Sequence, residues 1–249
     1  MNKPKMILFD YGGTLLYEPN LNPDAGNKAI FPYIKENPHN VTPDEFNNFL
    51  RGTFDKIRKM NGGLLEIHEH LFLRYVLEYF GIKLSIPIEE VEWIICNAIS
   101  DAQKTPGAEE MLTSLQSMGI RTGVISNLCW SGNALTRRLH EHFPNHQFEF
   151  ILTSSEYIFR KPEKLIFDLA VRKSGLNPDE VWYCGNDVAV DIYGANNAGL
   201  FPVFYDDRSI PSALHEKNDS ISVDFPCLRI SSCNELTNQL KNQNGAEGK

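Results

Sequence analysis

The sequence lacks three features that would each point to a particular class of protein. It has no excess of basic residues, because 24 Lys and Arg stand against 32 Asp and Glu, for a formal net charge of -8. Proteins that neutralise phosphate backbones carry the opposite balance, so we expect no nucleic-acid partner. It also has no apolar run near the roughly 20 residues that a membrane span needs, since charges or prolines interrupt every candidate. We therefore expect a soluble protein with no membrane partner.

Signals for export and for a cysteine framework are absent as well. Residues 1–9 lead into an apolar run that is too short for the hydrophobic region of a signal peptide, so we expect a cytoplasmic protein. The cysteines are odd in number and have no CxxC spacing, which favours reduced thiols, mostly in the core, over a disulfide or zinc framework. They are Cys96, Cys129, Cys184, Cys227 and Cys233.

What the sequence does contain is the composition of an ordinary globular protein, with 42% hydrophobic and 22% charged residues. Its 249 residues allow one core domain with a smaller insertion. From residue 105 onward, helices alternate with short apolar strands, which predicts a doubly wound, Rossmann-like parallel sheet with helices on both faces. The expected fold class is therefore α/β.

The same pattern predicts the individual elements of the sheet. Strands are expected over 5–9, 120–125, 148–152, 181–184 and 201–205. Helices are expected over 105–119, 163–173, 188–197 and 233–241, the first with Thr105 as N-cap and Pro106 in its first turn. The polar residues 244–249 are expected to form a disordered tail.

Residues 16–104 show a different pattern, in which helical periodicity replaces strands over a length far beyond an ordinary connection. Thr42 and Glu45 have the spacing of a capping box at the start of a helix, and another helix is expected over 88–99. We interpret the segment as an inserted helical cap. The expected domains are a core of residues 1–15 and 105–243 and a cap of residues 16–104, with hinge candidates at 19–26 and 104–106.

Four short motifs stand at the ends of predicted strands. They are Phe9-Asp10-Tyr11-Gly12-Gly13-Thr14-Leu15, then Ser126-Asn127, then Arg160-Lys161-Pro162, and then Gly185-Asn186-Asp187 followed by Asp191 and Gly194-Ala195. In their order, their strand context and the insertion between the first and second, they resemble the haloacid dehalogenase-like superfamily over essentially the whole chain. Open α/β folds bind ligands at the carboxyl edge of the sheet, where these motifs would converge.

The resemblance implies that Asp10 is a nucleophile. Its carboxylate would attack phosphorus to give an aspartyl-phosphate, which divides one difficult displacement into two easier steps. Lys161 matches the family's lysine, whose ammonium would neutralise the phosphate and hold Asp10 in its ionised form. Without the other motifs, Asp10 could equally cap a loop, and a lysine beside a proline at a helix start is normally just solvated.

A phosphate-binding set follows from the same resemblance. Gly12 and Gly13 let backbone amides approach a phosphate closely. Thr14 and Ser126 match family positions whose hydroxyls bind phosphate, and Asn127 offers further donors. The alternatives are a plain tight turn for the glycines and helix capping for the hydroxyls.

A magnesium ion (Mg²⁺) is the cofactor expected at this edge. Asp187 and Asp191 are four residues apart on one predicted helix face, and paired carboxylates suit a hard cation that prefers oxygen ligands. The alternative for these acids is stabilisation of the helix dipole. The expected metal ligands are Asp10, the Gly12 carbonyl, Asn186, Asp187 and Asp191, and the sequence leaves open whether Asn186, Asp187 or both reach the ion.

Two positions depart from the family pattern. Phosphatases of this superfamily usually carry a second Asp two residues after the nucleophile as general acid and base, and here that residue is Gly12. A positioned acid is typically worth about 10²- to 10⁴-fold in rate, so alkyl phosphates should suffer more from its loss than acyl or aryl phosphates. The second departure is Asn186, which stands where an Asp commonly ligates magnesium.

Cap residues usually choose the substrate in this family. The polar candidates here are Tyr17, Glu18, Glu66, His68 and His70. Since residues two apart on a helix face different directions, we expect His68 and His70 to lie at the surface, and we leave all of these residues out of the predicted site.

Three functions compete at this stage. The leading prediction is a magnesium-dependent phosphatase, monomeric or homodimeric, that hydrolyses a small phosphorylated metabolite. A catalytically impaired protein that binds phosphorylated ligands is the second, because positions 12 and 186 have lost acids. A metal-independent 2-haloacid dehalogenase ranks third, since Asp187 and Asp191 favour a metal.

Overall fold

The structure, a computed structural model, describes residues 3–60 and 62–246. Its centre is a parallel sheet of six strands in the order β10-β9-β8-β1-β6-β7, which confirms the predicted α/β fold. The strands are β1 (Met6–Phe9), β6 (Arg121–Ser126), β7 (Phe148–Thr153), β8 (Val181–Gly185), β9 (Phe201–Tyr205) and β10 (Leu228–Ile230). The sequence pattern does not predict β10, a short strand at the edge of the sheet. Because β1 lies between β6 and β8, the residues that follow these three strands are neighbours at the carboxyl edge.

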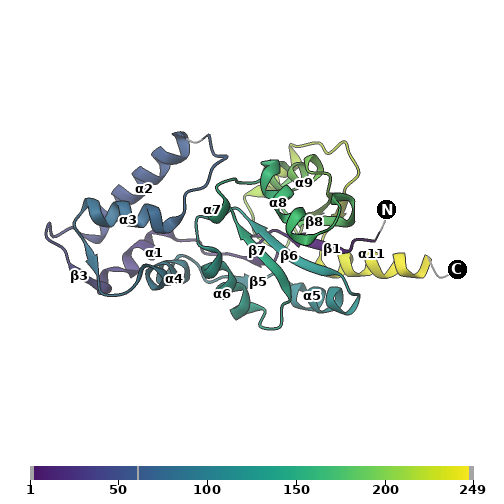
Figure 1. The fold of residues 1–249 in the computed structure, drawn as a ribbon, viewed down its shortest axis with the longest axis horizontal. Helices are drawn as coiled ribbons and strands as arrows, with labels where there is room; N and C mark the ends of the chain where they lie inside the picture. Colours follow the sequence, from purple (N-terminus) through teal and green to yellow (C-terminus); the bar gives the residue numbers. More distant parts are fainter. Residues whose placement is uncertain (1–2, 61, 247–249) are drawn as a thin grey trace.

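Helices cover both faces of this sheet (Figure 1). One face packs against α5 (Ala108–Ser117), α6 (Gly132–His142) and α11 (Cys233–Ala246), and the other against α8 (Lys164–Ser174) and α9 (Tyr193–Asn197). Strand β1 shows why two layers form, since Ile7 and Phe9 join the first apolar cluster while Met6 and Leu8 join the second. Alternation along a strand directs successive side chains to opposite faces. All four are fully buried.

Several boundaries differ from the sequence-based expectations. Helix α5 begins at Ala108, not in the turn after Thr105, because Gly107 has φ 78° and interrupts the helical backbone, while the Thr105 amide donates to the Leu15 carbonyl (3.0 Å). The predicted helix over 188–197 starts with a π-helical turn, η3 (Val188–Ile192). Helix α11 continues to Ala246, so residues 244–246 are helical and the tail prediction is wrong there, while 247–249 lie outside the described residues.

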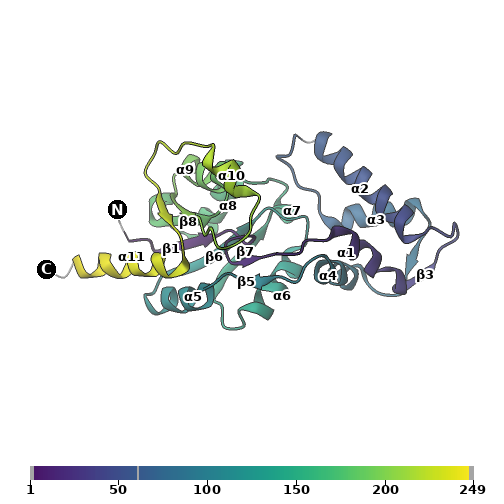
Figure 2. The same cartoon turned by 180° about the vertical axis from the view of Figure 1, so that it is seen from behind.

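The helical insertion, residues 16–104, leaves and rejoins the core through paired strands. Strand β2 (Leu16–Tyr17) pairs antiparallel with β5 (Gln103–Lys104). Figure 2 shows the insertion extending away from the sheet, so that the molecule is elongated. Between these strands lie α1 (Pro23–Ala29), β3 (Ile34–Glu36), α2 (Pro43–Met60), α3 (Glu69–Tyr79), β4 (Lys83–Leu84) and α4 (Ile88–Ile99). That the insertion acts as a cap stays a prediction.

Local sequence signals within the insertion are largely confirmed. Glu45 Oε2 accepts from the Thr42 amide (2.9 Å) and Thr42 Oγ1 accepts from the Glu45 amide (3.3 Å), which is the predicted capping box. Helix α4 has the predicted bounds. The proposed hinge loop over 19–26 is wrong in part, since α1 begins inside it, with Asn22 Oδ1 accepting from the Ala25 amide (3.2 Å).

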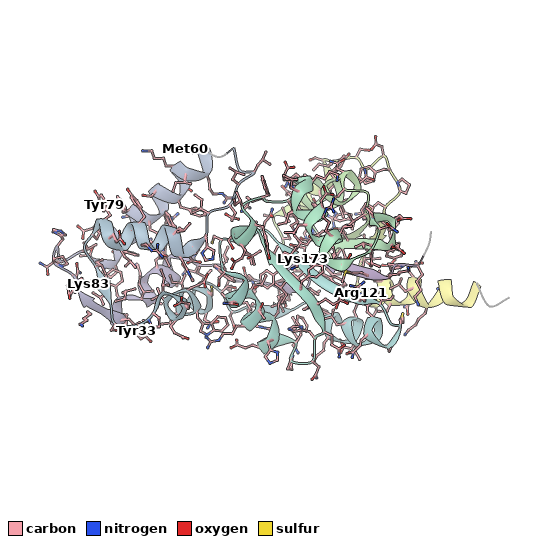
Figure 3. All side chains as sticks on the ribbon, in the orientation of Figure 1. Tyr33, Met60, Tyr79, Lys83, Arg121 and Lys173 are labelled. Atoms are coloured by element: carbon pink, nitrogen blue, oxygen red, sulfur yellow. The ribbon has the colours of Figure 1, made fainter. Side chains whose placement is uncertain are left out.

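Exposed side chains lie on both the insertion and the core, and the cysteines are free, as the sequence predicts. Figure 3 shows Met60 and Tyr79 on the insertion, distant from Arg121 and Lys173 on the core, and Met60 is 77% exposed. All five cysteines are free, three of them buried and two half-buried, as expected. Across the described ranges 3–60 and 62–246, no helix combines the length and hydropathy that a bilayer crossing demands.

Candidate active site

Asp10 directly follows β1 at the carboxyl edge of the sheet. Its amide donates to the carbonyl of Cys184 on the neighbouring strand β8 (2.9 Å), which fixes the start of the motif loop. The residue is only 8% exposed. A buried carboxylate requires compensation by a charge or by hydrogen bonds, and its partner comes from a distant part of the sequence.

That partner is Lys161. Its ammonium donates to Asp10 Oδ1 (2.7 Å), to Asp191 Oδ1 (2.7 Å) and to the hydroxyl of Tyr183 (2.6 Å). Lys161 is 3% exposed, so the structure places it inside the site and not in solvent. One buried cation thus pairs with two carboxylates, Asp10 and Asp191, that are far apart in the sequence. With two negative charges and one positive charge, the cluster has a net negative charge.

The charges in this cluster shift one another's protonation. Burial raises the pKa of Asp10 to about 6, while the Lys161 charge lowers it and the Asp191 charge raises it. Burial also lowers the pKa of Lys161, but the charges of Asp10 and Asp191, together with their hydrogen bonds, outweigh it and raise the pKa overall. At neutral pH the lysine is therefore charged and the Asp10 carboxylate is ionised, as a nucleophile requires.

Asn127 holds Lys161 in place. Its side-chain Nδ2 donates to the Lys161 carbonyl (2.8 Å), and its Oδ1 accepts from the Lys161 amide (2.7 Å). Both ends of the amide group are therefore engaged by the backbone of the lysine. The second N–H of Nδ2 remains for the phosphate contact, which stays a prediction, and Ser126, the last residue of β6, is buried at the carboxyl edge.

The loop after Asp10 is tightly folded around its glycines. Gly13 has φ 77°, and a Cβ atom at this position would lie 2.2 Å from Asn186 Nδ2, so only glycine fits. The Gly13 amide donates to the Leu16 carbonyl (2.7 Å), and Gly12 forms a β-bridge with Leu16. Thr14 Oγ1 is buried and has no hydrogen-bond partner among the described residues, as a group awaiting a polar ligand would be.

The two acids predicted to bind a metal are used differently. Asp191 Oδ2 accepts from the Asp187 amide (3.0 Å), and its Oδ1 contacts Lys161. Asp187 instead caps the π-helical turn, with Oδ1 accepting from two backbone amides (2.9 and 3.1 Å) and Oδ2 paired with Lys217 (2.7 Å). Asp187 thus has the arrangement of the helix-dipole alternative, while Asp191 lies beside Asp10.

The residues present suit a magnesium ion. No group of three or more His, Cys, Asp or Glu side chains is placed to hold a metal within 3–60 and 62–246. Magnesium requires fewer protein ligands, because it keeps several waters and is usually held by one or two carboxylates. Asp10 and Asp191 supply two carboxylates, and the side chain of Asn186 lies against Gly13 beside them. The donor set is therefore small but chemically appropriate.

Sequence reasoning missed Tyr183 in this cluster and assigned no role to Gly185, although it noted that glycine in the last motif. Tyr183 lies on β8 and donates its hydroxyl to the Ile125 carbonyl (3.2 Å) while it accepts from Lys161. At Gly185 a Cβ atom would lie 2.5 Å from the Asp191 carboxylate, so the glycine lets this acid approach the strand. The apolar run that forms β8, a strand buried along its whole length, could have indicated Tyr183, since its polar hydroxyl would need a buried partner.

Comparison with known proteins places this architecture in a family. The profile described as haloacid dehalogenase-like hydrolase matches residues 7–204, which includes the insertion and all four motifs. The chain belongs to the haloacid dehalogenase-like hydrolase family. The resemblance seen in the sequence is thereby confirmed.

Relatives within this hydrolase family include proteins named as phosphatases. The chain is 25% identical over 236 residues to the ribulose-1,5-bisphosphate 5-phosphatase of Halopiger xanaduensis, covering 93% of this chain and 97% of the relative. It is 34% identical over 208 residues to the glyceraldehyde 3-phosphate phosphatase of Methanopyrus kandleri, covering 80% and 82%. A 2-haloacid dehalogenase from Pseudomonas syringae shares the fold, with a TM-score of 0.63, 17% identity and coverage of 96% and 99%.

Three buried glutamates, Glu66, Glu69 and Glu92, join the insertion of this hydrolase to its core, and we call them the docking glutamates. Glu66 is paired with Arg160 and accepts from Ser154 Oγ (3.0 Å). The Glu69 amide donates to the Cys129 carbonyl (2.9 Å).

Glu92 and the two histidines complete this contact. Glu92 accepts from the amide of Ser131 (2.6 Å) and from its hydroxyl (2.6 Å), and lies 2.9 Å from His70 Nε2. His68 is the N-cap of α3 and has extended backbone, so the argument from helical spacing does not apply to it. The two imidazole rings are 4.6 Å apart and half-buried, and the expected surface placement of this pair is wrong.

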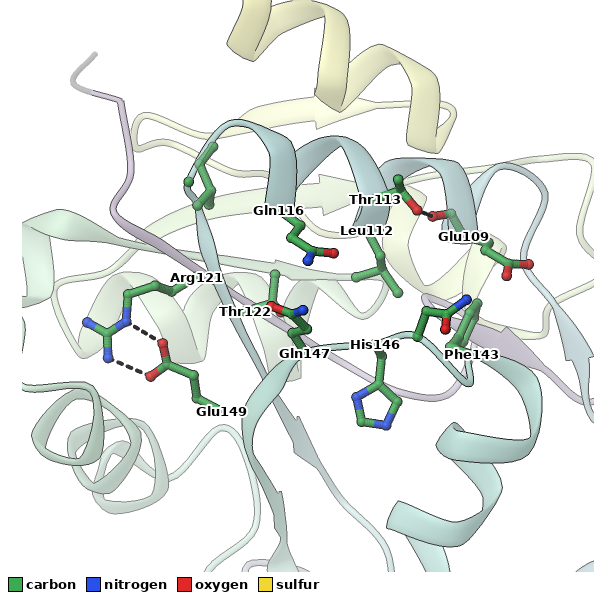
Figure 4. A pocket seen from close by; sticks show the side chains of 13 residues that line it. Glu109, Leu112, Thr113, Gln116, Arg121, Thr122, Phe143, His146, Gln147 and Glu149 are labelled. Carbon is green, nitrogen blue, oxygen red and sulfur yellow. Dashed lines mark hydrogen bonds and ion pairs between the residues drawn. The ribbon is translucent and has the colours of Figure 1, made fainter.

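A separate hollow of about 280 Å³ lies at the opposite end of the sheet (Figure 4). It is lined by the first residues of β6 and β7, and Arg121 and Glu149 form two hydrogen bonds across it (2.5 and 2.6 Å). None of the predicted site residues contributes to it, so it is distinct from the candidate active site.

Proposed function

We propose that this chain is a magnesium-dependent phosphatase that hydrolyses a small phosphorylated metabolite through an aspartyl-phosphate on Asp10. The observation that carries the proposal is the buried ammonium of Lys161, which contacts Asp10 and Asp191 at 2.7 Å each. A cation fixed beside a nucleophilic carboxylate neutralises an incoming phosphate and orients the acid for attack. The phosphatase names of two relatives over most of the chain support the same reaction class.

The proposed reaction has two displacements at phosphorus. In the first, an Asp10 oxygen forms a bond to phosphorus while the bond to the leaving alcohol oxygen breaks. In the second, a water oxygen forms a bond to phosphorus while the bond from phosphorus to the Asp10 oxygen breaks, which releases inorganic phosphate and restores the carboxylate. The proton that the water loses goes to the departed alkoxide or to solvent. Magnesium, held by Asp10, Asp191 and neighbouring oxygens, would neutralise charge on the transferring phosphoryl group. Lys161 contributes a second positive charge to the same group.

Gly12 sets the expected substrate reactivity. It provides no carboxyl group to protonate the leaving oxygen, so the reaction should be fastest when that oxygen leaves without a proton. Acyl and aryl phosphates meet this condition better than alkyl phosphates. The same glycine motivates the second candidate, a protein that binds phosphorylated ligands without turnover.

The decisive experiment measures hydrolysis of acetyl phosphate and 4-nitrophenyl phosphate, with magnesium and with a chelator. We expect magnesium-dependent turnover by the wild type and a loss of roughly 10³-fold or more in Asp10→Asn, because the amide cannot act as the nucleophile. Full activity in Asp10→Asn would rule out the covalent route. Binding of these compounds without turnover by the wild type would favour the second candidate, and activity that survives complete chelation would favour the dehalogenase type of site.

A further inference from the structure

A cavity of about 480 Å³ lies between the helical insertion and the core, within the range of small-molecule sites. It is lined by Asn127, which holds the backbone of Lys161, and by Arg160, which precedes Lys161 in the chain. The cavity therefore lies next to residues that position Lys161, and we take it as the space for the organic part of a substrate bound at Asp10.

The walls of the cavity are mostly apolar. On the insertion side they come from α2, α3 and α4, and on the core side from the loop that follows β6. The large apolar side chains that line it include Leu50, Phe54, Phe72, Ile95, Leu128 and Trp130.

Most of the polar groups that line the cavity have partners within the chain. Arg160 is paired with Glu66, whose carboxylate also accepts from Ser154. Arg51 is paired with Asp24 (2.9 Å). The amide group of Asn127 is engaged at both ends by Lys161, as described above, so few donors or acceptors remain for a ligand's hydroxyl groups.

The charges in the cavity also leave little attraction for a second anionic group. Burial, reinforced by the charge of Glu92, raises the pKa of Glu69 to about 8, so this lining carboxyl is largely neutral at pH 7. Arg58 and Asp55 also line the cavity; both are exposed, and their opposite charges are three positions apart on one face of α2.

We propose that the preferred substrate is a phosphomonoester whose organic group is apolar, such as an aromatic ring or a branched aliphatic chain, and that this cavity binds it. The inference rests on the proposed function and refines its substrate class. A polyhydroxylated sugar phosphate would lose water in the cavity without gaining partners, at about 1–3 kcal/mol for each hydroxyl group left unpaired. The chain would then differ in substrate from its phosphatase relatives that are named for sugar phosphates.

The first test compares two non-hydrolysable ligands of similar length by calorimetry, with magnesium present. These are 3-phenylpropylphosphonate and 4,5,6,7-tetrahydroxyheptylphosphonate, which share the phosphonate group and three methylene groups and differ in the cavity-directed end. We expect the phenyl compound to bind roughly 10-fold tighter or more, as apolar pockets discriminate. Equal or weaker binding of the phenyl compound overturns the inference. The result needs no turnover, so it is independent of whether the chain is a catalyst.

A variant pair localises the effect to the cavity. Leu50 is half-buried and lines the cavity, whereas Leu71 is 59% exposed on α3 and does not. Leu50→Asn should weaken binding of 3-phenylpropylphosphonate roughly 10-fold, because it puts a polar side chain into the apolar wall. Leu71→Asn should leave this binding unchanged. Unchanged phosphonate binding in Leu50→Asn and in a second wall variant, Phe54→Ser, would overturn the inference, whereas loss of acetyl phosphate turnover in the wild type would count only against the proposed function.

Discussion

The core and the helical insertion both bury charged side chains, but they use them differently. In the core, Asp10 and Asp191 both contact Lys161, so the cluster has a net negative charge. A bound metal cation can neutralise this charge. At the insertion, the docking glutamates are satisfied chiefly by groups of the core itself, such as Ser131, Ser154 and Arg160. The first arrangement suits chemistry, and the second suits attachment. The difference teaches that burial of charge alone does not identify a reactive site. A buried cluster whose charges do not cancel within the protein does.

Removing the central cation should have the largest effect. In Lys161→Met, two buried carboxylates lose their shared partner, so we expect a loss of roughly 10³-fold in phosphatase turnover. We also expect a fall of about 3–5 kcal/mol in the free energy of unfolding, measured by urea denaturation at pH 7. Lys164→Met is the matched control, since Lys164 is three residues away, half exposed and paired with Asp168 at the surface. A Lys161→Met protein as stable as this control would show that the core cluster does not depend on its lysine.

Substitutions of the two acids of the last motif, Asp191 and Asp187, should differ in their effect on the magnesium requirement, and this effect is smaller than that of Lys161→Met. Asp191→Asn should raise the magnesium concentration for half-maximal activity by roughly 10- to 100-fold, because it removes a carboxylate beside Asp10. Asp187→Asn should change it less than about threefold, since asparagine also caps helices well and Asp187 contacts helix amides and Lys217. Titration of activity with magnesium distinguishes the two. Equal shifts would make Asp187 as much a metal ligand as Asp191.

In the insertion, the expected effect is a dependence of the free energy of unfolding on pH, which arises from Glu69. The pKa of Glu69 is raised from 4.5 to about 8, so between these values the unfolded chain loses the proton while the folded protein keeps it. Stability should therefore fall as pH rises through this window and stay level above it, at ~1.4 kcal/mol for each pKa unit of difference.

Glu69→Gln removes this titration. Its free energy of unfolding should exceed that of the wild type by a few kcal/mol at pH 9, on the order set by the same relation, and the difference should vanish near pH 4.5. Denaturation of both proteins across this range checks the sign. A difference that stays constant with pH would show that Glu69 is ionised in the folded protein.

The comparison also explains which features the sequence can predict. Asp10 and the elements β1, β8, β9 and α4 follow from local patterns, because a short apolar run or a helix period is set by neighbours in the chain. The resemblance to the family assigned Lys161 to the site. Considered alone, a lysine beside a proline would be predicted to lie in solvent.

The features that escaped prediction depend on contacts between distant residues. The positioning role of Asn127 requires Lys161, 34 residues away, and Glu92 requires Ser131, 39 residues away. No spacing rule links such pairs. His70 and Glu69 look like ordinary surface residues in an amphipathic pattern, yet Glu69 is buried beside Cys129 of the core and His70 is half-buried beside Glu92. Tertiary packing here overrides the local expectation.

The paired strands β2 and β5 have a consequence for how such a chain can change. Leu16 lies opposite Lys104 and Tyr17 opposite Gln103, so the insertion leaves and returns at adjacent points. To the sheet it is the loop of one β-hairpin, and lengthening a loop costs only about 0.6 kcal/mol for each doubling. The connection to the core therefore allows residues 16–104 to be exchanged as one unit. A different folded unit with ends one strand spacing apart could replace it and give the same catalytic strands a new substrate, without altering the sequence of Asp10 and its neighbours.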